Sequence, residues 1–180
     1  NLYEELLKID PNHFKAIFLL GSLQIQTKNF LKAIQFLKRA VQIQSDHKIA
    51  HNYLGIAFCK LGQLQKAIDS HERSIQIDPN YAEAHNNLGI AFKELGQLQK
   101  AIDCHEKGIQ IDPNNSDAYN SLGTVFGELG QLEKEKSCYE KAIKINPNNP
   151  DPYWNLHSQA LNIDEALNIL IKLNNIDNTF

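Results

Sequence analysis

The chain has 180 residues, of which 42% are hydrophobic and 22% are charged, close to the composition of ordinary globular proteins. This composition excludes intrinsic disorder and a collagen-like repeat, and no apolar run reaches the roughly 18 residues that a membrane-spanning helix needs. Eighteen Lys and Arg against 21 Asp and Glu give a net charge of -3, with no dense basic segment to neutralise a phosphate backbone. We therefore expect neither membrane insertion nor nucleic-acid binding.

The chain carries three cysteines, Cys59, Cys104 and Cys138. They are too few and too irregularly spaced for a disulfide framework, and no secretory signal precedes them. A reducing, cytoplasmic location is therefore expected.

The sequence repeats with a period of 34 residues. Residues 48–81 and 82–115 are identical at 25 of 34 aligned positions, and the same frame extends to 14–47 and 116–149. This predicts four complete repeats, which we number so that residues 14, 48, 82, 116 and 150 hold repeat position 1. Residues 1–13 then belong to a truncated preceding repeat and residues 150–180 to a shortened, degenerate C-terminal repeat, all within one solenoid domain.

The predicted elements follow this frame along the chain. Residues 1–13 hold only a second helix, helix B, on which Leu2, Leu6 and Leu7 would present an uncovered face. Each complete repeat reads as helix A, a turn and helix B, because apolar residues recur every three or four positions on both segments; in the repeat at 82–115 the turn contains Gly96. Residues 150–161 begin another helix A, and the last helix, 164–174, is apolar nearly all round. We expect a following domain, a second copy of the chain or a crystal neighbour to cover it.

Small residues recur where the two helices of one hairpin must approach closely. Helix A carries Gly55, Gly89 and Gly123, and helix B carries Ala33, Ala67 and Ala101. Glu135 occupies the fourth of these alanine positions, where an unpaired carboxylate would be costly to bury. We therefore expect a locally weaker helix B between Leu132 and Ile145.

The repeat resembles the tetratricopeptide repeat. The pattern is a bulky residue, Leu-Gly, an aromatic residue, Ala, a second large residue and Pro; it is represented here by His85, Leu88, Gly89, Phe92, Ala101, His105 and Pro113. Gln24, Ser45 and Glu135 depart from it without shifting the frame. The resemblance implies an all-α fold, a right-handed α-solenoid of stacked antiparallel helix pairs with helix A lining the concave side.

Motifs for chemistry are weak. His51 and His85 share one repeat position, as do His71 and His105, so neighbouring copies lie one repeat apart, too far to share a metal ion. We expect these histidines to pack, Cys104 and Cys138 to be small packing residues, and Asn115 to cap the helix that starts at Ser116. No catalytic residues, no cofactor and no metal site are expected, and the chain is predicted not to be an enzyme.

The outward face of the A helices carries the candidate ligand contacts. The repeats at 48–81 and 82–115 differ there, at Tyr53 and Asn87 and at Cys59 and Lys93 among others, and asparagine is enriched at repeat positions 5 and 6. An amide both donates and accepts, so a row of amides suits the backbone of an extended peptide. The candidates for this groove are Asn52, Tyr53, Ile56, Asn86, Asn87, Ile90, Lys93, Asn120 and Asn155.

Two interpretations of the asparagines stay open. The row is similar to the asparagine ladder in the repeat domain of O-linked N-acetylglucosamine transferase, although only Asn87 and Asn155 match its position. Alternatively, the amides bond within or between neighbouring helices. The positive charges of a carboxylate clamp are absent from the corresponding positions, while Glu83, Asp117 and Asp151 make the later part of this face acidic, which favours a basic or neutral ligand.

Three functions follow from these observations. The first is a non-catalytic scaffold that binds protein or extended peptide through the helix A surface. The second is the substrate-recognition arm of a larger enzyme, such as a transferase, lying outside this chain. The third is self-association through exposed repeat ends.

Overall fold

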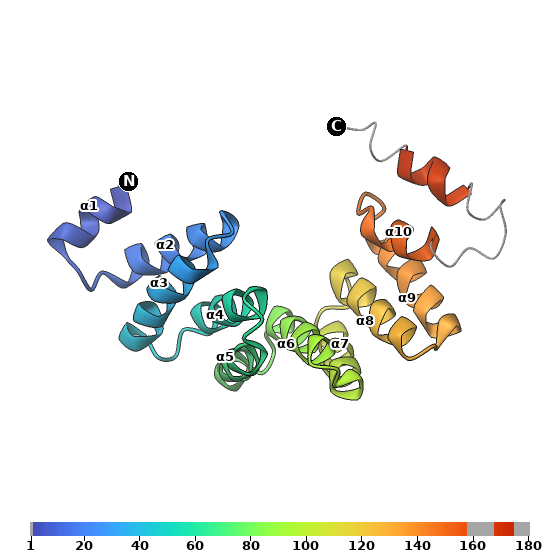
Figure 1. The fold of residues 1–180 in the computed structure, drawn as a ribbon, viewed down its shortest axis with the longest axis horizontal. Coiled ribbons are helices and arrows are strands. Elements are labelled where there is room, and N and C mark those ends of the chain that lie inside the picture. The colour runs from blue at the N-terminus through green and yellow to red at the C-terminus, as the bar shows by residue number, and fades with distance from the viewer. Residues whose placement is uncertain (1, 158–167, 175–180) are drawn as a thin grey trace. The chain divides into compact units, whose positions relative to one another are not determined.

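The computed structural model describes residues 2–157 and 168–174, and all of the regular secondary structure in these ranges is helical (Figure 1). The chain forms two compact units, residues 1–97 and residues 98–180. The stacking of antiparallel helix pairs within them is that of an α-solenoid.

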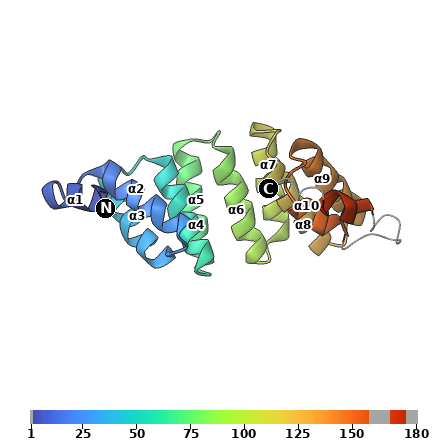
Figure 2. The same cartoon turned by 90° about the horizontal axis from the view of Figure 1, so that it is seen from above.

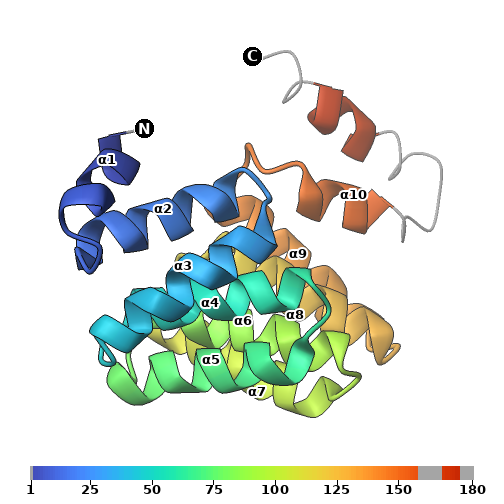
Figure 3. The same ribbon diagram turned by 60° about the vertical axis from the view of Figure 1, so that its left-hand side comes forward.

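Unit 1 contains six helices: α1 (Leu2–Ile9), α2 (Phe14–Gln26), α3 (Phe30–Ile43), α4 (Lys48–Lys60), α5 (Leu64–Ile77) and α6 (Ala82–Glu94). Helices α2 and α3 form one hairpin and α4 and α5 the next, and consecutive hairpins stack through α3 against α4 and α5 against α6 (Figure 2). Helix α1 packs against α2 at the end of the unit (Figure 3). The A helices α2, α4 and α6 also contact one another in succession.

Unit 2 contains α7 (Leu98–Ile111), α8 (Ser116–Glu128), α9 (Leu132–Ile145) and α10 (Asp151–His157), and residues 168–174 are helical as well. Helices α8 and α9 pair as a hairpin, flanked by α7 and α10. Ile169 and Leu173 are buried against Tyr153, whereas Leu170 and Ile171 are exposed. The predicted last helix is thus described only from 168 to 174; its earlier residues lie outside the described part.

The period of 34 residues also sets the ends of the helices. The side chains of His13, His47 and Asn115, 34 or 68 residues apart, each accept a hydrogen bond from the backbone N–H three residues later, at 3.2, 3.1 and 3.0 Å. This satisfies an otherwise unpaired donor of the first helical turn, and it confirms the cap predicted at Asn115. The turns between helices use a positive φ at Lys28, Gly62, Gly96 and Gly130, a conformation that glycine adopts without steric cost.

Small residues allow the two helices of a hairpin to approach. A Cβ atom placed on Gly55 would lie 2.6 Å from the His71 ring, and one on Gly123 would lie 2.6 Å from the Tyr139 ring. Ala33, Ala67 and Ala101 are fully buried on the helix B side. His71 and His105 are also buried, which confirms their prediction as packing residues.

The amino-terminal helix is only partly uncovered. Leu2 is 76% exposed, as expected for a helix B without its partner. Leu7 instead packs beside the cluster of Ile17, Ala40 and Ala50. The expectation that Leu7 lies on an uncovered face is wrong, because α1 turns this side chain toward α2.

Glu135 is buried at the contact between α8 and α9, with 4% of its surface exposed. Its Oε1 atom accepts a hydrogen bond from the Tyr139 hydroxyl at 3.2 Å, while Oε2 has no hydrogen-bond partner among the described residues. Burial and the nearby Glu135 carboxylate raise the pKa of Tyr139, which keeps this donor protonated. The carboxylate fits because the facing residue of α8 is Gly127, where a Cβ atom would lie 3.0 Å from Oε2.

Replacing Glu135 tests the cost of this burial. We expect Glu135→Ala, which restores the residue of the other three repeats, to raise the melting temperature by about 2–4 °C for each kcal/mol recovered from the unpaired carboxylate. Circular dichroism measures the transition. Glu133→Ala is the control, because Glu133 is exposed on the same helix. The Glu133→Ala variant should have the melting temperature of the wild type. An unchanged melting temperature for Glu135→Ala would contradict the prediction.

The burial of His71 predicts a pH dependence of stability. Burial lowers the pKa of His71 from 6.5 to about 4, so between these values the unfolded chain binds a proton that the folded chain does not. The free energy of unfolding should therefore fall as the pH drops from about 6.5 to about 4, by up to about 3 kcal/mol from this residue, with no contribution above that range.

Urea unfolding at about pH 7.5 and at about pH 4.5 measures this loss. His71→Leu is the matching variant, because Leu37 faces Gly21 at the same repeat position. The variant should lose less stability between the two pH values than the wild type. Equal losses in both proteins would show that His71 does not carry the effect.

Candidate functional site

The predicted groove residues divide into exposed and buried groups. Tyr53 and Ile56 on α4, Asn87, Ile90 and Lys93 on α6, and Asn120 and Asn155 in unit 2 are all partly exposed. Asn52 is fully buried and Asn86 is 7% exposed. The two buried amides therefore lie beneath the surface that the sequence analysis assigned to them.

Asn52 holds unit 1 together through four hydrogen bonds. Its Oδ1 atom accepts from Nδ1 of His71 at 2.9 Å and from Nδ2 of Asn87 at 3.1 Å. Its Nδ2 atom donates to Oε1 of Glu83 at 3.0 Å and to the Tyr81 hydroxyl at 3.4 Å. All of its bonding capacity is used inside the protein, so Asn52 positions the surface and does not itself contact a ligand.

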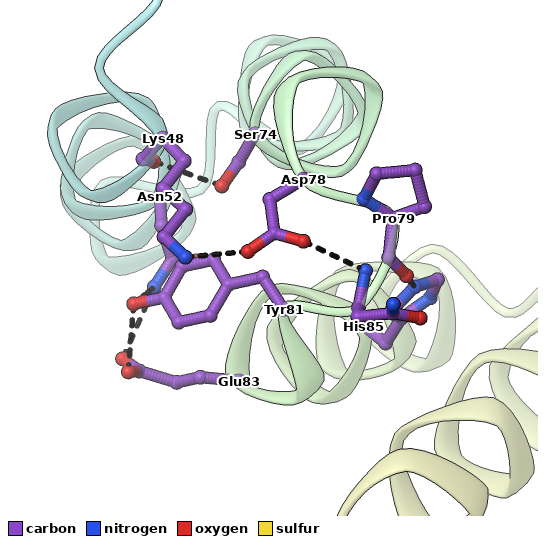
Figure 4. Close-up of polar contacts among 9 residues, drawn as sticks. Lys48, Asn52, Ser74, Asp78, Pro79, Tyr81, Glu83 and His85 are labelled. Atoms are coloured by element: carbon purple, nitrogen blue, oxygen red, sulfur yellow. Dashed lines mark hydrogen bonds and ion pairs between the residues drawn. The ribbon is translucent and has the colours of Figure 1, made fainter.

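A polar cluster surrounds this amide at the junction of α4, α5 and α6 (Figure 4). Lys48 forms an ion pair with Asp78, and its ammonium lies 5.1 Å from the centre of the Tyr81 ring. The Tyr81 hydroxyl donates to Oε2 of Glu83 at 2.9 Å. Burial and the Glu83 carboxylate raise the pKa of Tyr81, so it remains a donor. The cluster fixes where α6 begins relative to α4.

In three places, the residue at repeat position 6 contacts the residue at position 5 of the preceding repeat. Tyr53 stacks on Phe18 with ring centres 5.9 Å apart, Asn87 donates to Asn52 at 3.1 Å, and Asn155 donates to Asn120 at 3.0 Å. The asparagines thus tie neighbouring A helices together, which is the second of the two interpretations. Asn87 uses one N–H in this way, and its Oδ1 forms no hydrogen bond with the described residues.

A hollow lies between α4 and α6. Its volume is about 120 Å³, and its lining residues are Ile56, Cys59, Lys60, His71, Asn87 and Ile90. Ile56, Asn87 and Ile90 were among the predicted candidates, and the hollow brings them together. Because Nδ1 of His71 donates to Asn52, its neutral ring keeps an acceptor at Nε2.

Cys59, Lys60 and His71 were not predicted as site residues. The differences between repeats at Cys59 and Lys60 were the available signal, whereas His71 appeared only as a packing residue. Burial and the Glu94 carboxylate raise the pKa of the Cys59 thiol to about 11. Since the thiolate is the reactive form, Cys59 serves here as an apolar wall and not as a nucleophile.

An aromatic group continues this surface toward the start of the chain. The rings of Phe14 and Phe18 are stacked 6.0 Å apart, and the His47 ring lies 4.9 Å from each of them. With Tyr53, which was predicted as a groove residue, these rings make the α2–α4 part of the surface apolar.

Within residues 2–157 and 168–174, no group of His, Cys, Asp and Glu side chains is arranged to hold a metal ion. Over the same ranges, no helix is long and apolar enough to cross a membrane. Cys59, Cys104 and Cys138 form no disulfide bond with one another.

Comparison with protein families identifies the repeat. A model described as TPR repeat matches residues 57–96. Two models described as tetratricopeptide repeat match residues 82–115 and 116–149. Residues 1–74 match the model of the anaphase-promoting complex (cyclosome) subunit 3. A search of curated proteins found no match.

Several solved structures are similar. The crystal structure of MamA is 30% identical, with a TM-score of 0.73, over 81% of this chain and 85% of MamA. A MamA RS-1 ArsTM double mutant is 20% identical, with a TM-score of 0.74, over 92% and 95% of the two chains. YrrB, described as a TPR protein with an unusual peptide-binding site, is 17% identical, with a TM-score of 0.69, over 98% of this chain and 92% of YrrB.

The three repeat models together span residues 57–149, more than half of the chain, and the identity to MamA extends over most of both proteins. The chain therefore belongs to the tetratricopeptide repeat family.

Proposed function

We propose that the A-helix surface of unit 1 binds an extended polypeptide, with one apolar side chain of the ligand seated between α4 and α6. The observation that carries this proposal is the hollow lined by Ile56, Asn87 and Ile90. The peptide-binding site named for YrrB supports it by analogy.

The size of the hollow favours a side chain over a small-molecule ligand. Its volume of about 120 Å³ equals that of about four water molecules in the liquid. Pockets for cofactors and drug-sized ligands measure roughly 300–1,000 Å³. One branched aliphatic side chain is the group that fits, with Ile56 and Ile90 as its apolar walls.

Asn87 supplies the polar contact to the ligand backbone. One of its N–H groups is held by Asn52 at 3.1 Å, which fixes the orientation of the amide before a ligand arrives. Its Oδ1 atom and second N–H remain to accept from, and donate to, a peptide group. A fixed amide loses less side-chain entropy on binding than a mobile one.

Lys60 lines the hollow at the end of α4, and Tyr53 stacks on Phe18 toward the start of the chain. This arrangement places aromatic contacts at one end of the ligand and a positive charge at the other. The part of the ligand beside Lys60 is therefore proposed to be neutral or acidic.

A peptide array probed with the full chain tests the proposal. We expect Ile90→Asp to weaken binding to the array hits by about tenfold or more, because a carboxylate replaces an apolar wall of the hollow. Asn87→Ala should weaken them by a smaller factor, about that of one hydrogen bond. Fluorescence anisotropy on individual hits measures both effects.

Matched controls separate binding from folding. Ile43→Asp makes the same substitution at an exposed position of helix B, and Asn80→Ala removes an exposed amide from a turn. Both controls should bind as the wild type does. If the Ile90→Asp variant folds and binds every hit as tightly as the wild type, the hollow is not the binding site.

A further inference from the structure

The A helices of unit 2 are acidic. Helix α8 and helix α10 carry Asp117, Glu128 and Asp151 and contain no Lys or Arg, and all three carboxylates are exposed. The lysines in the described helices of this unit lie on α7, α9 and the helical stretch 168–174, outside α8 and α10. In unit 1, by contrast, the A helices carry Lys15, Lys48, Lys60 and Lys93.

A buried carboxylate adds to this charge at one point. Glu135 comes from α9, but its carboxylate reaches α8 beside Gly127, where it occupies the space that a side chain at position 127 would fill. Its only hydrogen bond from a described residue is that of the Tyr139 hydroxyl to Oε1. Oε2 is buried without a hydrogen bond, and Gly127 above it is partly exposed.

Gly127 and Glu135 change the surface of unit 2 at a repeat position that lines the proposed ligand site in unit 1. Gly127 occupies repeat position 12, the position of Cys59, which lines the hollow between α4 and α6. Tyr139 occupies the position of His71, which also lines that hollow. In unit 2, Gly127 at position 12 leaves space for the carboxylate of Glu135, which comes from position 20, where unit 1 presents the thiol of Cys59.

An unpaired buried carboxylate is costly, and a cation that reaches it recovers part of that cost through a charge-assisted hydrogen bond. The nearest lysine in sequence, Lys134, lies with its ammonium 5.1 Å from the Phe126 ring. Because Gly127 has no side chain, a long, flexible side chain that ends in a positive charge can approach the carboxylate from the surface of α8.

We propose that the surface at Gly127, with Glu135 beneath it, is a subsite for a Lys or Arg side chain of a bound polypeptide. The subsite extends the proposed polypeptide binding to unit 2. That its biological ligand is a polypeptide rests on the proposed function. It predicts a ligand that carries a basic residue in addition to the apolar residue taken by unit 1.

Nuclear magnetic resonance of the full chain tests the subsite with small probes. The probes are the Nα-acetyl methylamides of lysine and arginine, with those of norleucine and glutamate as neutral and acidic counterparts. The lysine and arginine probes should shift the amide signal of Gly127 saturably, and the norleucine and glutamate probes should not. Glu135→Gln, which keeps the shape and removes the charge, should weaken this response by roughly tenfold.

Glu133→Gln is the matched control, because it makes the same change of charge at an exposed position of the same helix. It should leave the response unchanged, and circular dichroism verifies that both variants fold. A Gly127 signal that no basic probe shifts, or one that shifts equally in Glu135→Gln, overturns the subsite. Ile90→Asp should not alter this response, because Ile90 lies in unit 1. If the peptide array gives no binding that depends on Ile90, but the basic probes still shift the Gly127 signal, only the unit 1 proposal is overturned.

Discussion

The close approach of the two helices in each hairpin is the constraint on which the rest of the structure depends. A glycine of helix A lies against a large side chain of helix B, as Gly55 does against His71 and Gly123 against Tyr139. Packing at this density leaves no room for a Cβ atom. Because the contact fixes how the helices of a pair face each other, it also fixes which residues of helix A point outward.

The buried polar groups follow from the same contact. A histidine that packs on Gly55 must satisfy its Nδ1 proton inside the hairpin, and Asn52, one turn earlier on α4, accepts it at 2.9 Å. Asn52 then has one lone pair left on Oδ1, which receives the Asn87 amide from the next repeat. A packing requirement within one hairpin thereby determines the orientation of a side chain on the surface of the next.

The sequence carried the architecture because the architecture is periodic. The helix boundaries of the four complete repeats recur at the same offsets, with caps at His13, His47 and Asn115 and turns at Gly62, Gly96 and Gly130, so one hairpin predicts the others. The site was less predictable. Asn86 and Asn87 are adjacent in sequence, yet about 100° of helical rotation buries the first and exposes the second. Asn52 could not be assigned from its own helix, because its partner His71 lies 19 residues away.

The contact between Gly127 and Glu135 is a second feature that the repeat pattern predicted only in part. Glu135 differs in the sequence from the alanines of the other repeats, which predicted a weaker helix B at α9. Its accommodation by Gly127, eight residues earlier, depends on how two helices face each other, which periodicity alone does not reveal. The two substitutions are complementary, because a side chain lost from helix A makes space for one gained on helix B.

The variation between repeats therefore has a physical meaning that depends on position. Positions 5 and 6 hold residues that bind one another across neighbouring A helices, as Phe18 does with Tyr53 and Asn52 with Asn87, so changes there must preserve a contact within the protein. Positions 9 and 12 lie on the outward face, where Ile56 and Ile90 line the hollow and Cys59 also donates a hydrogen bond to Glu94 of the next repeat at 3.4 Å. Ile56 and Ile90 give way to Thr124 at position 9, and Cys59 and Lys93 to Gly127 at position 12. Differences at these outward positions change the chemistry of the surface that we propose to bind polypeptide, while the contacts at positions 5 and 6 hold neighbouring A helices together.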